Sequence, residues 1–297
     1  MITRAAPLYA HGIGSKAAHV KLSNKNIHVI LPKKNVNVIM PDPNHGIKRE
    51  VLATTKLKDR RVVTYELAVE KDTPLVSNFL QSFFITNESL GATVGLDADD
   101  AKAIAEVITP KLTYNVIAKV DENIVGVSCF AFEEHKEQTP LPDWPTDFGK
   151  LIDKGPTNRR KANVVLNYVF QCEKYTYHRV PAPSLLAHGA ILSVHPAYQG
   201  QGIGLILDMS AYKQAYERGA DYVINMNSSI ATNLMSMNLP AQKLIQQCEF
   251  AKYVDYGTRP FENMIDGAKT NGIYTVDLKQ SWPVYDKILK DAIQKRS

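Results

Sequence analysis

The spacing of apolar residues along the chain predicts strands and helices in alternation. Apolar and β-branched residues alternate, or run together, in seven segments typical of strands: 61–69, 114–120, 124–132, 188–194, 222–226, 250–254 and 273–278. Apolar residues recur at helical spacing in six others: 74–84, 97–107, 161–175, 202–217, 240–247 and 281–295. Hairpin strands come first and strand-helix units follow, which predicts an α/β fold with a mixed sheet.

The first 59 residues have a different pattern. Two short alternating runs, 27–31 and 36–40, surround the polar turn Pro32-Lys33-Lys34-Asn35 and predict a hairpin. Residues 41–59 are polar and contain two prolines, as linkers often do. We therefore expect an N-terminal extension over residues 1–59 and a compact domain over residues 60–297. The proline-rich, charged stretch 135–160 predicts a loop.

The charge of the chain is concentrated at its N-terminus. The net charge is +5, from 35 basic and 30 acidic residues. Residues 1–41 hold six of the basic residues and no acid, which leaves 29 basic against 30 acidic groups in the rest. The main domain is thus nearly neutral, which argues against a nucleic-acid-binding protein. The acid-free N-terminus keeps a mitochondrial transit peptide open as a minor alternative.

Other sequence features bear on the compartment. No apolar run reaches the ~18 residues that a membrane span needs, so no membrane partner is expected. The three cysteines are far apart and odd in number, and they match neither a zinc-binding nor a disulfide spacing; no metal is predicted. These features favour free thiols in a reducing compartment and a cytoplasmic protein.

The stretch from Leu192 to Gly204 carries the clearest chemical signal. An apolar strand ends at Pro196, a turn with three glycines follows, and an amphipathic helix begins directly after it. Glycines let a bulky anion approach the backbone, and the start of a helix presents free N–H groups to it. The spacing matches neither a P-loop nor the dinucleotide fingerprint. The sequence therefore predicts a pyrophosphate site that is built from backbone N–H groups.

This turn resembles a signature of the GNAT superfamily of N-acetyltransferases. Gln199-x-x-Gly202-x-Gly204 resembles its Arg/Gln-x-x-Gly-x-Gly/Ala motif, and the stretch from Asn238 to Phe250 resembles its second conserved block. The resemblance covers about residues 61–278. It implies a GNAT fold, with a mostly antiparallel sheet that is splayed at the cofactor site and flanked by helices, and acetyl-CoA as the acetyl donor. It also implies these cofactor-binding residues: Leu192, Ser193, Val194, Gln199, Gly200, Gln201, Gly202, Ile203, Gly204 and Asn238.

A second resemblance concerns the acceptor. The segment from Phe83 to Leu96 resembles a segment of the invertebrate arylalkylamine N-acetyltransferases, in which the glutamate that maps to Glu88 is the catalytic base. A carboxylate in a partly apolar pocket can bind an ammonium group and remove its proton. The implied reaction is direct attack of a small primary amine, such as an arylalkylamine, on the thioester. The competing interpretation is that Glu88 caps a helix or faces solvent.

The sequence departs from these families at several positions. The residue at the place of the frequent proton-donating tyrosine is Ile245, and the paired serines of insect members map to Met237 and Ala241. We expect structural roles for His188 and His195. Five aromatic residues are candidates for an aryl pocket, although such residues are more often core: Phe83, Phe84, Trp144, Tyr168 and Phe170.

Two alternative functions stay open at this stage. Acidic runs such as Asp97-Ala-Asp99-Asp100 and Glu133-Glu134 are compatible with acetylation of polyamines or protein lysines. The absence of the tyrosine is compatible with a non-catalytic acyl-CoA-binding module.

Overall fold

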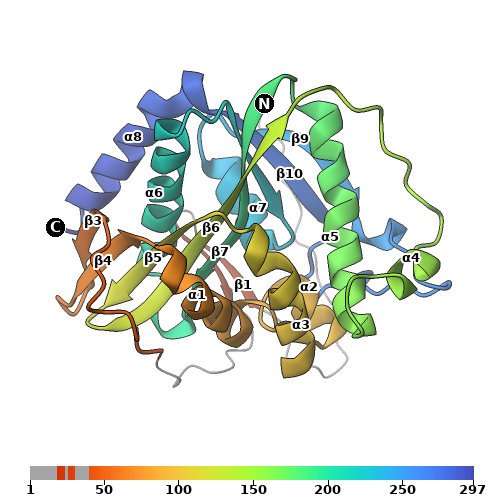
Figure 1. The fold of residues 1–297 in the computed structure, drawn as a ribbon, viewed down its shortest axis with the longest axis horizontal. Coiled ribbons are helices and arrows are strands. Elements are labelled where there is room, and N and C mark those ends of the chain that lie inside the picture. Colours follow the sequence, from red (N-terminus) through yellow and green to blue (C-terminus); the bar gives the residue numbers. More distant parts are fainter. Residues whose placement is uncertain (1–18, 24–25, 31–39) are drawn as a thin grey trace.

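The main structural element is an eight-stranded sheet (Figure 1). The computed structural model describes residues 19–23, 26–30 and 40–297. The strand order is β3-β4-β5-β6-β7-β8-β10-β9, and every neighbouring pair is antiparallel except β7 and β8. The strands are β3 (Val51–Lys56), β4 (Val62–Leu67), β5 (Tyr114–Val120), β6 (Asn123–His135), β7 (Ser184–Val194), β8 (Tyr222–Asn227), β9 (Lys243–Glu249) and β10 (Thr270–Asp277). This arrangement confirms the predicted α/β class with a mostly antiparallel sheet.

Helices cover both faces of the sheet and divide the core into two layers. One layer packs α6 and α8 against β3–β5, and the other packs α1, α3 and α5 against the middle of the sheet. The helices are α1 (Thr73–Phe79), the π-helical turn η2 (Leu80–Phe84), α2 (Ser89–Val94), α3 (Ala98–Ile108), α4 (Gly149–Asp153), α5 (Arg160–Arg179), α6 (Ile203–Glu217), α7 (Ile230–Asn238) and α8 (Leu278–Gln294). Short 3₁₀ turns are η1 (Glu70–Asp72), η3 (Thr109–Lys111), η4 (Pro196–Tyr198) and η5 (Phe250–Lys252).

The segment after β8 differs from its prediction. Residues 240–247 do not form a helix; Lys243–Glu249 is strand β9, which pairs with β10, and residues 250–252 form a 3₁₀ turn rather than a strand. Ala241 has a φ of +60°, which a right-handed helix does not allow. The helix that follows β8 is instead α7, in which Ser229 caps the backbone N–H of Thr232.

The domain reaches further toward the N-terminus than residue 60. Strand β3 is the edge of the sheet, and its Lys56 N–H donates to the Arg296 carbonyl near the C-terminus. The expected linker 41–59 therefore contains a strand of the domain. Strand β2 (Asn26–Ile30) pairs antiparallel with β1 (His19–Ser23); the other arm of the predicted hairpin lies, apart from Met40, outside the described residues.

A buried ion cluster holds this N-terminal segment. The Arg49 side chain is 1% exposed and its guanidinium contacts Asp42 and Asp72, both at 2.8 Å. Glu66 and Lys119 complete the cluster, with Lys119 Nζ 3.0 Å from Asp42. Asp42 precedes β3 and Lys119 lies in β5, so the cluster ties the start of the domain to the centre of the sheet.

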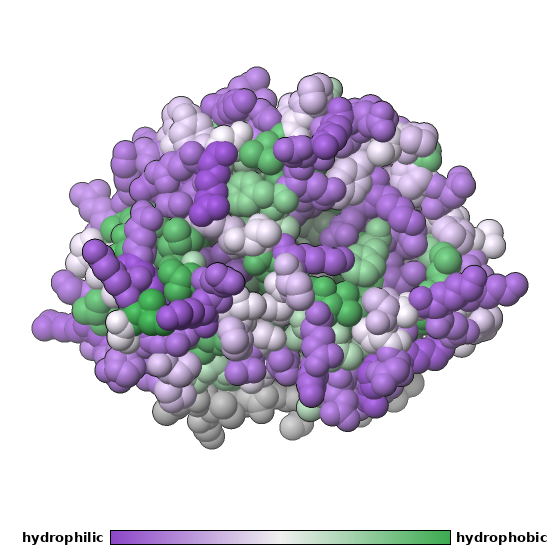
Figure 2. All heavy atoms as spheres, viewed as in Figure 1, coloured by the Kyte–Doolittle hydropathy of each residue, from purple (hydrophilic) through white to green (hydrophobic). Residues whose placement is uncertain are grey.

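In the part of the chain that the structure describes, no helix is long and apolar enough to cross a bilayer. Figure 2 shows apolar side chains on one face of the molecule in small patches, separated by hydrophilic ones. The three cysteines are buried and free.

Replacing Arg49 tests the role of the ion cluster. Arg49→Ala leaves two buried carboxylates without their main partner, so we expect the free energy of unfolding to fall by about 3–5 kcal/mol. Urea denaturation followed by circular dichroism measures this change. Lys290→Ala, which breaks the exposed pair with Asp286, is the control and should cost less than about 1 kcal/mol. Equal effects of the two substitutions would contradict the prediction.

Candidate active site

The sheet opens between β7 and β8. The two parallel strands pair only from Leu186↔Tyr222 to Gly189↔Asn225, and beyond these pairs β7 continues alongside β6 alone. Within the described part of the chain, the β7 residues 190–194 therefore have a free backbone edge, without a strand partner, on the side of β8. The register with β6 also shifts between the pairs that Gly189 and Ile191 make, so Ala190 is an extra, bulged residue.

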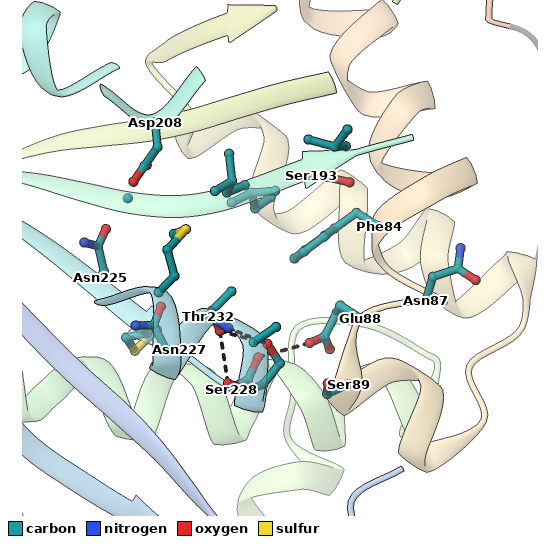
Figure 3. A pocket seen from close by; sticks show the side chains of 18 of the residues that line it. Phe84, Asn87, Glu88, Ser89, Ser193, Asp208, Asn225, Asn227, Ser228 and Thr232 are labelled. Atoms are coloured by element: carbon teal, nitrogen blue, oxygen red, sulfur yellow. Dashed lines mark hydrogen bonds between the residues drawn. The ribbon is translucent and has the colours of Figure 1, made fainter. Parts of the chain in front are cut away.

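A cavity of about 320 Å³ fills this opening (Figure 3). Its walls come from β7, β8, α6, the start of α7 and the segment from Phe83 to Ser89. The predicted residues Leu192, Ser193, Val194 and Gln199 line it, as does Glu88. Segments that are far apart in the sequence thus meet at the point where the sheet loses its hydrogen bonds.

The glycine turn leads from the end of β7 into α6. Gly200 and Gly202 have φ values of 75° and 81°, a backbone region that favours glycine, and Gly202 is the N-cap residue of α6. Gln199 Nε2 donates to the Val194 carbonyl at 3.0 Å and holds the turn against the strand. The turn is formed by the predicted residues Gly200, Gln201, Gly202, Ile203 and Gly204, which lie beside the cavity rather than in its wall.

Glu88 combines the two roles that the sequence left open. It is the N-cap residue of α2, where its Oε1 accepts from the Gly91 N–H at 2.7 Å. Its Oε2 faces the cavity and accepts from Ser228 Oγ at 3.2 Å (Figure 3). Burial raises the pKa of Glu88 to about 7, although the hydrogen bonds from Gly91 and Ser228 oppose this. Capping fixes the carboxylate in place, and burial brings its pKa close to neutral pH.

The residues of the second block lie in α7 and β9 and the turn between them. Asn238 is exposed at the end of α7, where its Nδ2 donates to the Leu234 carbonyl, and it does not line the cavity. Ile245 lies in β9, and Met237 is 69% exposed. The hydroxyl residues from this part of the chain that line the cavity are instead Ser228, Ser229, Thr232 and Ser236, just before and within α7. Sequence reasoning assigned them no role because it placed the helix after β8 about ten residues too late.

Asp208 is a second carboxylate that sequence reasoning missed. It lies on α6, 5% exposed, and lines the cavity beside Asn225 (Figure 3). It makes no hydrogen bond or ion pair with the described part of the chain. Burial raises the pKa of Asp208 to about 7. The available signal was an acid in the otherwise apolar run Leu205-Ile206-Leu207-Asp208-Met209 of a buried helix.

Of the five aromatic candidates, only Phe83 and Phe84 line the cavity. Phe84 projects into it near Glu88 (Figure 3). Trp144 and Tyr168 pack against each other and against core rings elsewhere. The imidazole Nδ1 of His195 accepts from the Ala197 N–H, and the ring packs on Phe83, which gives it structural contacts. His188 faces Glu133 and Tyr177 and does not line the cavity.

Comparison with solved structures identifies the fold. Arylalkylamine N-acetyltransferase 2 from Aedes aegypti is 15% identical, with a TM-score of 0.55 over 73% of this chain and 99% of that one. The Drosophila melanogaster polyamine N-acetyltransferase that forms N-acetylagmatine is 16% identical, with a TM-score of 0.54 over 72% and 99% of the two chains. A mosquito arylalkylamine N-acetyltransferase-like protein, 5b, is 17% identical, with a TM-score of 0.51 over 72% and 98%.

These proteins resemble the chain in their fold and little in their sequence. The chain has the fold of the GNAT N-acetyltransferases, as the glycine signature implied. No protein-family profile matches the sequence. No curated protein matches it either.

Asp208 should lower the stability of the protein as pH rises. The folded state keeps the proton up to about pH 7, whereas an unfolded aspartate releases it near pH ~3.9, so the folded state binds more protons between these values. We expect Asp208→Asn to gain in free energy of unfolding, relative to the native chain, between pH 4 and 7, and the gain to level off above pH 7. Urea denaturation at a series of pH values measures it. Asp99→Asn, at an exposed position, is the control, and a gain that does not vary with pH would contradict the prediction.

Proposed function

We propose that the protein is an acetyl-CoA-dependent N-acetyltransferase that acts on a small primary amine. The observation that carries the proposal is the free edge of β7, which has a glycine turn and a helix start at one end and the carboxylate of Glu88 across the cavity. The free edge can pair with an extended acyl carrier as an added strand would. The N–H groups of the glycine turn can bind an anion, and the carboxylate can bind an ammonium group and accept its proton.

The donor side follows from unpaired backbone groups. Within the described part of the chain, the N–H and C=O groups of residues 190–193 on the side of β8 have no strand partner and can pair with the amide groups of a pantetheine arm, whereas the Val194 carbonyl already accepts from Gln199. The N–H groups of the glycine turn and of the first turn of α6 favour a pyrophosphate. Acetyl-CoA would supply the activated acetyl group, and N–H groups of β7 near the bulge at Ala190 would stabilise negative charge on the carbonyl oxygen.

The acceptor side depends on Glu88. A primary ammonium group must lose a proton before its nitrogen can attack a thioester. A carboxylate whose pKa is about 7 is ionised in part at neutral pH and is basic enough to accept that proton. Ser228 positions the carboxylate through its hydrogen bond to Oε2.

Two observations favour different acceptors. Phe83 and Phe84 give one wall of the cavity an apolar, aromatic surface, which favours an arylalkylamine. The carboxylates of Glu88, Asp208 and Asp266 also line the cavity and favour a diamine or polyamine. We propose the arylalkylamine class first, because Phe84 projects into the cavity near Glu88.

Rates of acetylation on a panel of amines distinguish an arylalkylamine acceptor from a polyamine acceptor. Release of thiol from acetyl-CoA should be fastest with tryptamine or tyramine and slower with spermidine, agmatine or a lysine peptide. The opposite order would establish the polyamine alternative. Tight binding of acetyl-CoA in calorimetry without turnover on any amine would favour a non-catalytic acyl-CoA-binding module.

Gly202 provides a test of the anion site. Gly202→Ala puts a side chain at a φ of 81° and against the Arg296 guanidinium, 2.3 Å from the ideal Cβ position. We expect the affinity for acetyl-CoA in calorimetry to fall at least tenfold, because the side chain strains the turn at this φ and displaces the Arg296 guanidinium from the Gln201 carbonyl. Gly219→Ala at the other end of α6 is the control, with a φ of 83° and open space around it. Both variants should lose about 1–2 kcal/mol of stability, but only Gly202→Ala should lose affinity.

Glu88 provides a test of the chemistry. Glu88→Gln should lower kcat/KM by about 10²- to 10⁴-fold and remove the increase in rate that the native enzyme shows as pH rises through about 7. Initial rates between pH 5.5 and 9 measure both effects. Asp97→Asn is the control, since Asp97 also caps a helix but lies outside the cavity. Full turnover of the Glu88 variant with an unchanged pH profile would show that Glu88 is not the base.

A further inference from the structure

Transfer of an acetyl group from a thioester leaves a thiolate, and the proposed function accounts for the base but not for the group that protonates this thiolate. Three titratable side chains line the cavity in the described part of the chain: Glu88, Asp208 and Asp266. No tyrosine, cysteine, histidine or lysine is among the residues that line it. Among the described side chains that line the cavity, these three carboxyl groups are the candidates for the proton donor.

Two of the three carboxyl groups are already engaged as acceptors. Asp266 accepts from Ser89 Oγ at 2.9 Å, from the Ile230 N–H at 2.9 Å and from the Ala268 N–H at 3.1 Å. Glu88 accepts from Gly91 and Ser228. Both oxygens of each of these two carboxyl groups therefore already accept a hydrogen bond from the protein.

Asp208 is different, because no described residue donates to it. It is 5% exposed and faces the cavity from α6, on the other side of the cavity from Glu88 (Figure 3). An isolated buried carboxylate costs far more free energy than the protonated acid. The titratable groups that face it are the phenols of Tyr212 on α6 and Tyr285 on α8, whose own pKa values burial raises, so no cation offsets the cost of its charge.

The position of Asp208 also fits the reacting end of an acyl carrier. Asn225 is the last β8 residue that pairs with β7, and its partner is Gly189. Figure 3 places Asp208 beside Asn225, at the narrow end of the opening. The strand from Gly189 to Val194 spans ~17 Å, so a carrier anchored at the glycine turn and extended along the free edge points its thioester toward this end.

We propose that Asp208 is the general acid that protonates the departing thiolate. The inference rests on the proposed function. Glu88 removes one proton from the ammonium group and releases it to solvent, and the amine nitrogen then forms a bond to the acetyl carbon. As the carbon–sulfur bond breaks, Glu88 accepts the second proton of the nitrogen and the Asp208 carboxyl group gives its proton to the sulfur. Before the next cycle solvent restores the proton of Asp208, and Glu88 releases the second proton that it accepted.

Protonation at neutral pH follows from burial. Desolvation raises the pKa of Asp208 to about 7, so a substantial fraction of the acid form is present there. An uncharged carrier arm that fills the cavity displaces further water and favours the acid form more. The rate should therefore fall at alkaline pH as Asp208 loses its proton.

The experiment measures kcat with saturating acetyl-CoA and amine between pH 5.5 and 9.5 for the native enzyme, Asp208→Asn and Asp208→Glu. We expect Asp208→Asn to lower kcat about 10- to 100-fold and to abolish the alkaline decrease, and Asp208→Glu to restore both in part. Glu173→Gln is the matched control; burial also raises the pKa of Glu173 to about 7, but Glu173 lies outside the cavity. Glu173→Gln should keep the pH profile of kcat that the native enzyme shows.

Two further measurements distinguish a general acid from a residue that only binds coenzyme A or supports the fold. Calorimetry with coenzyme A alone should give affinities for the native protein and Asp208→Asn that agree within about threefold. Carbon NMR of the unliganded protein should show a carboxyl signal that titrates near pH 7 and disappears in Asp208→Asn. An unchanged alkaline decrease in Asp208→Asn, or a loss of coenzyme A affinity with kcat unchanged, would overturn the inference. A native protein that acetylates no amine would instead overturn the proposed function.

Discussion

The short parallel ladder between β7 and β8 is the constraint on which the rest of the site depends. Four residue pairs join these strands, and the ladder ends at Gly189 and Asn225. Backbone groups that lose their partner inside a protein need another one. The free edge of β7 therefore creates both the space for a ligand and the groups that would bind it. Antiparallel pairing of β7 with β6 on its other side keeps the strand in place while that edge stays open.

The second physical property of the cavity is that two of its carboxyl groups are buried away from water. Burial raises the pKa of both Glu88 and Asp208 to about 7, but their surroundings differ. Glu88 has donors on both oxygens, whereas Asp208 has none in the described residues. Two carboxyl groups of the same cavity thus differ in their hydrogen-bond partners rather than in the direction of their pKa shifts, and this difference is the basis for different parts in one reaction. Folding bears the cost of burying both groups.

Local patterns predicted those parts of the molecule whose structure depends on local interactions. The glycine turn forms as the residues from Gln199 to Gly204 indicate, because a positive φ at Gly200 and Gly202 and a helix start are local properties. The segment at Leu244 and Ile245 has apolar spacing that suits a helix, yet it forms a strand because β10 offers an edge to pair with. Arg49 lies in a stretch that has the composition of a polar linker. Its place in a buried ion cluster could not be predicted, because the cluster includes Asp72 and Lys119, which are distant in the sequence.

The sequence by itself predicted the alternation of strands and helices and the turn at the end of β7, and it pointed to Glu88 as a candidate, because each depends on neighbouring residues or on a motif. Only the tertiary structure decided that Ser228 donates to Glu88, from 140 positions away in the chain. It alone also decided that Asp208 faces the cavity and that Asn238 does not. The physical reason is that burial and hydrogen bonding between distant segments arise when the sheet and its helices pack together. An acid in an apolar helix carries no information about its surroundings until that packing exists.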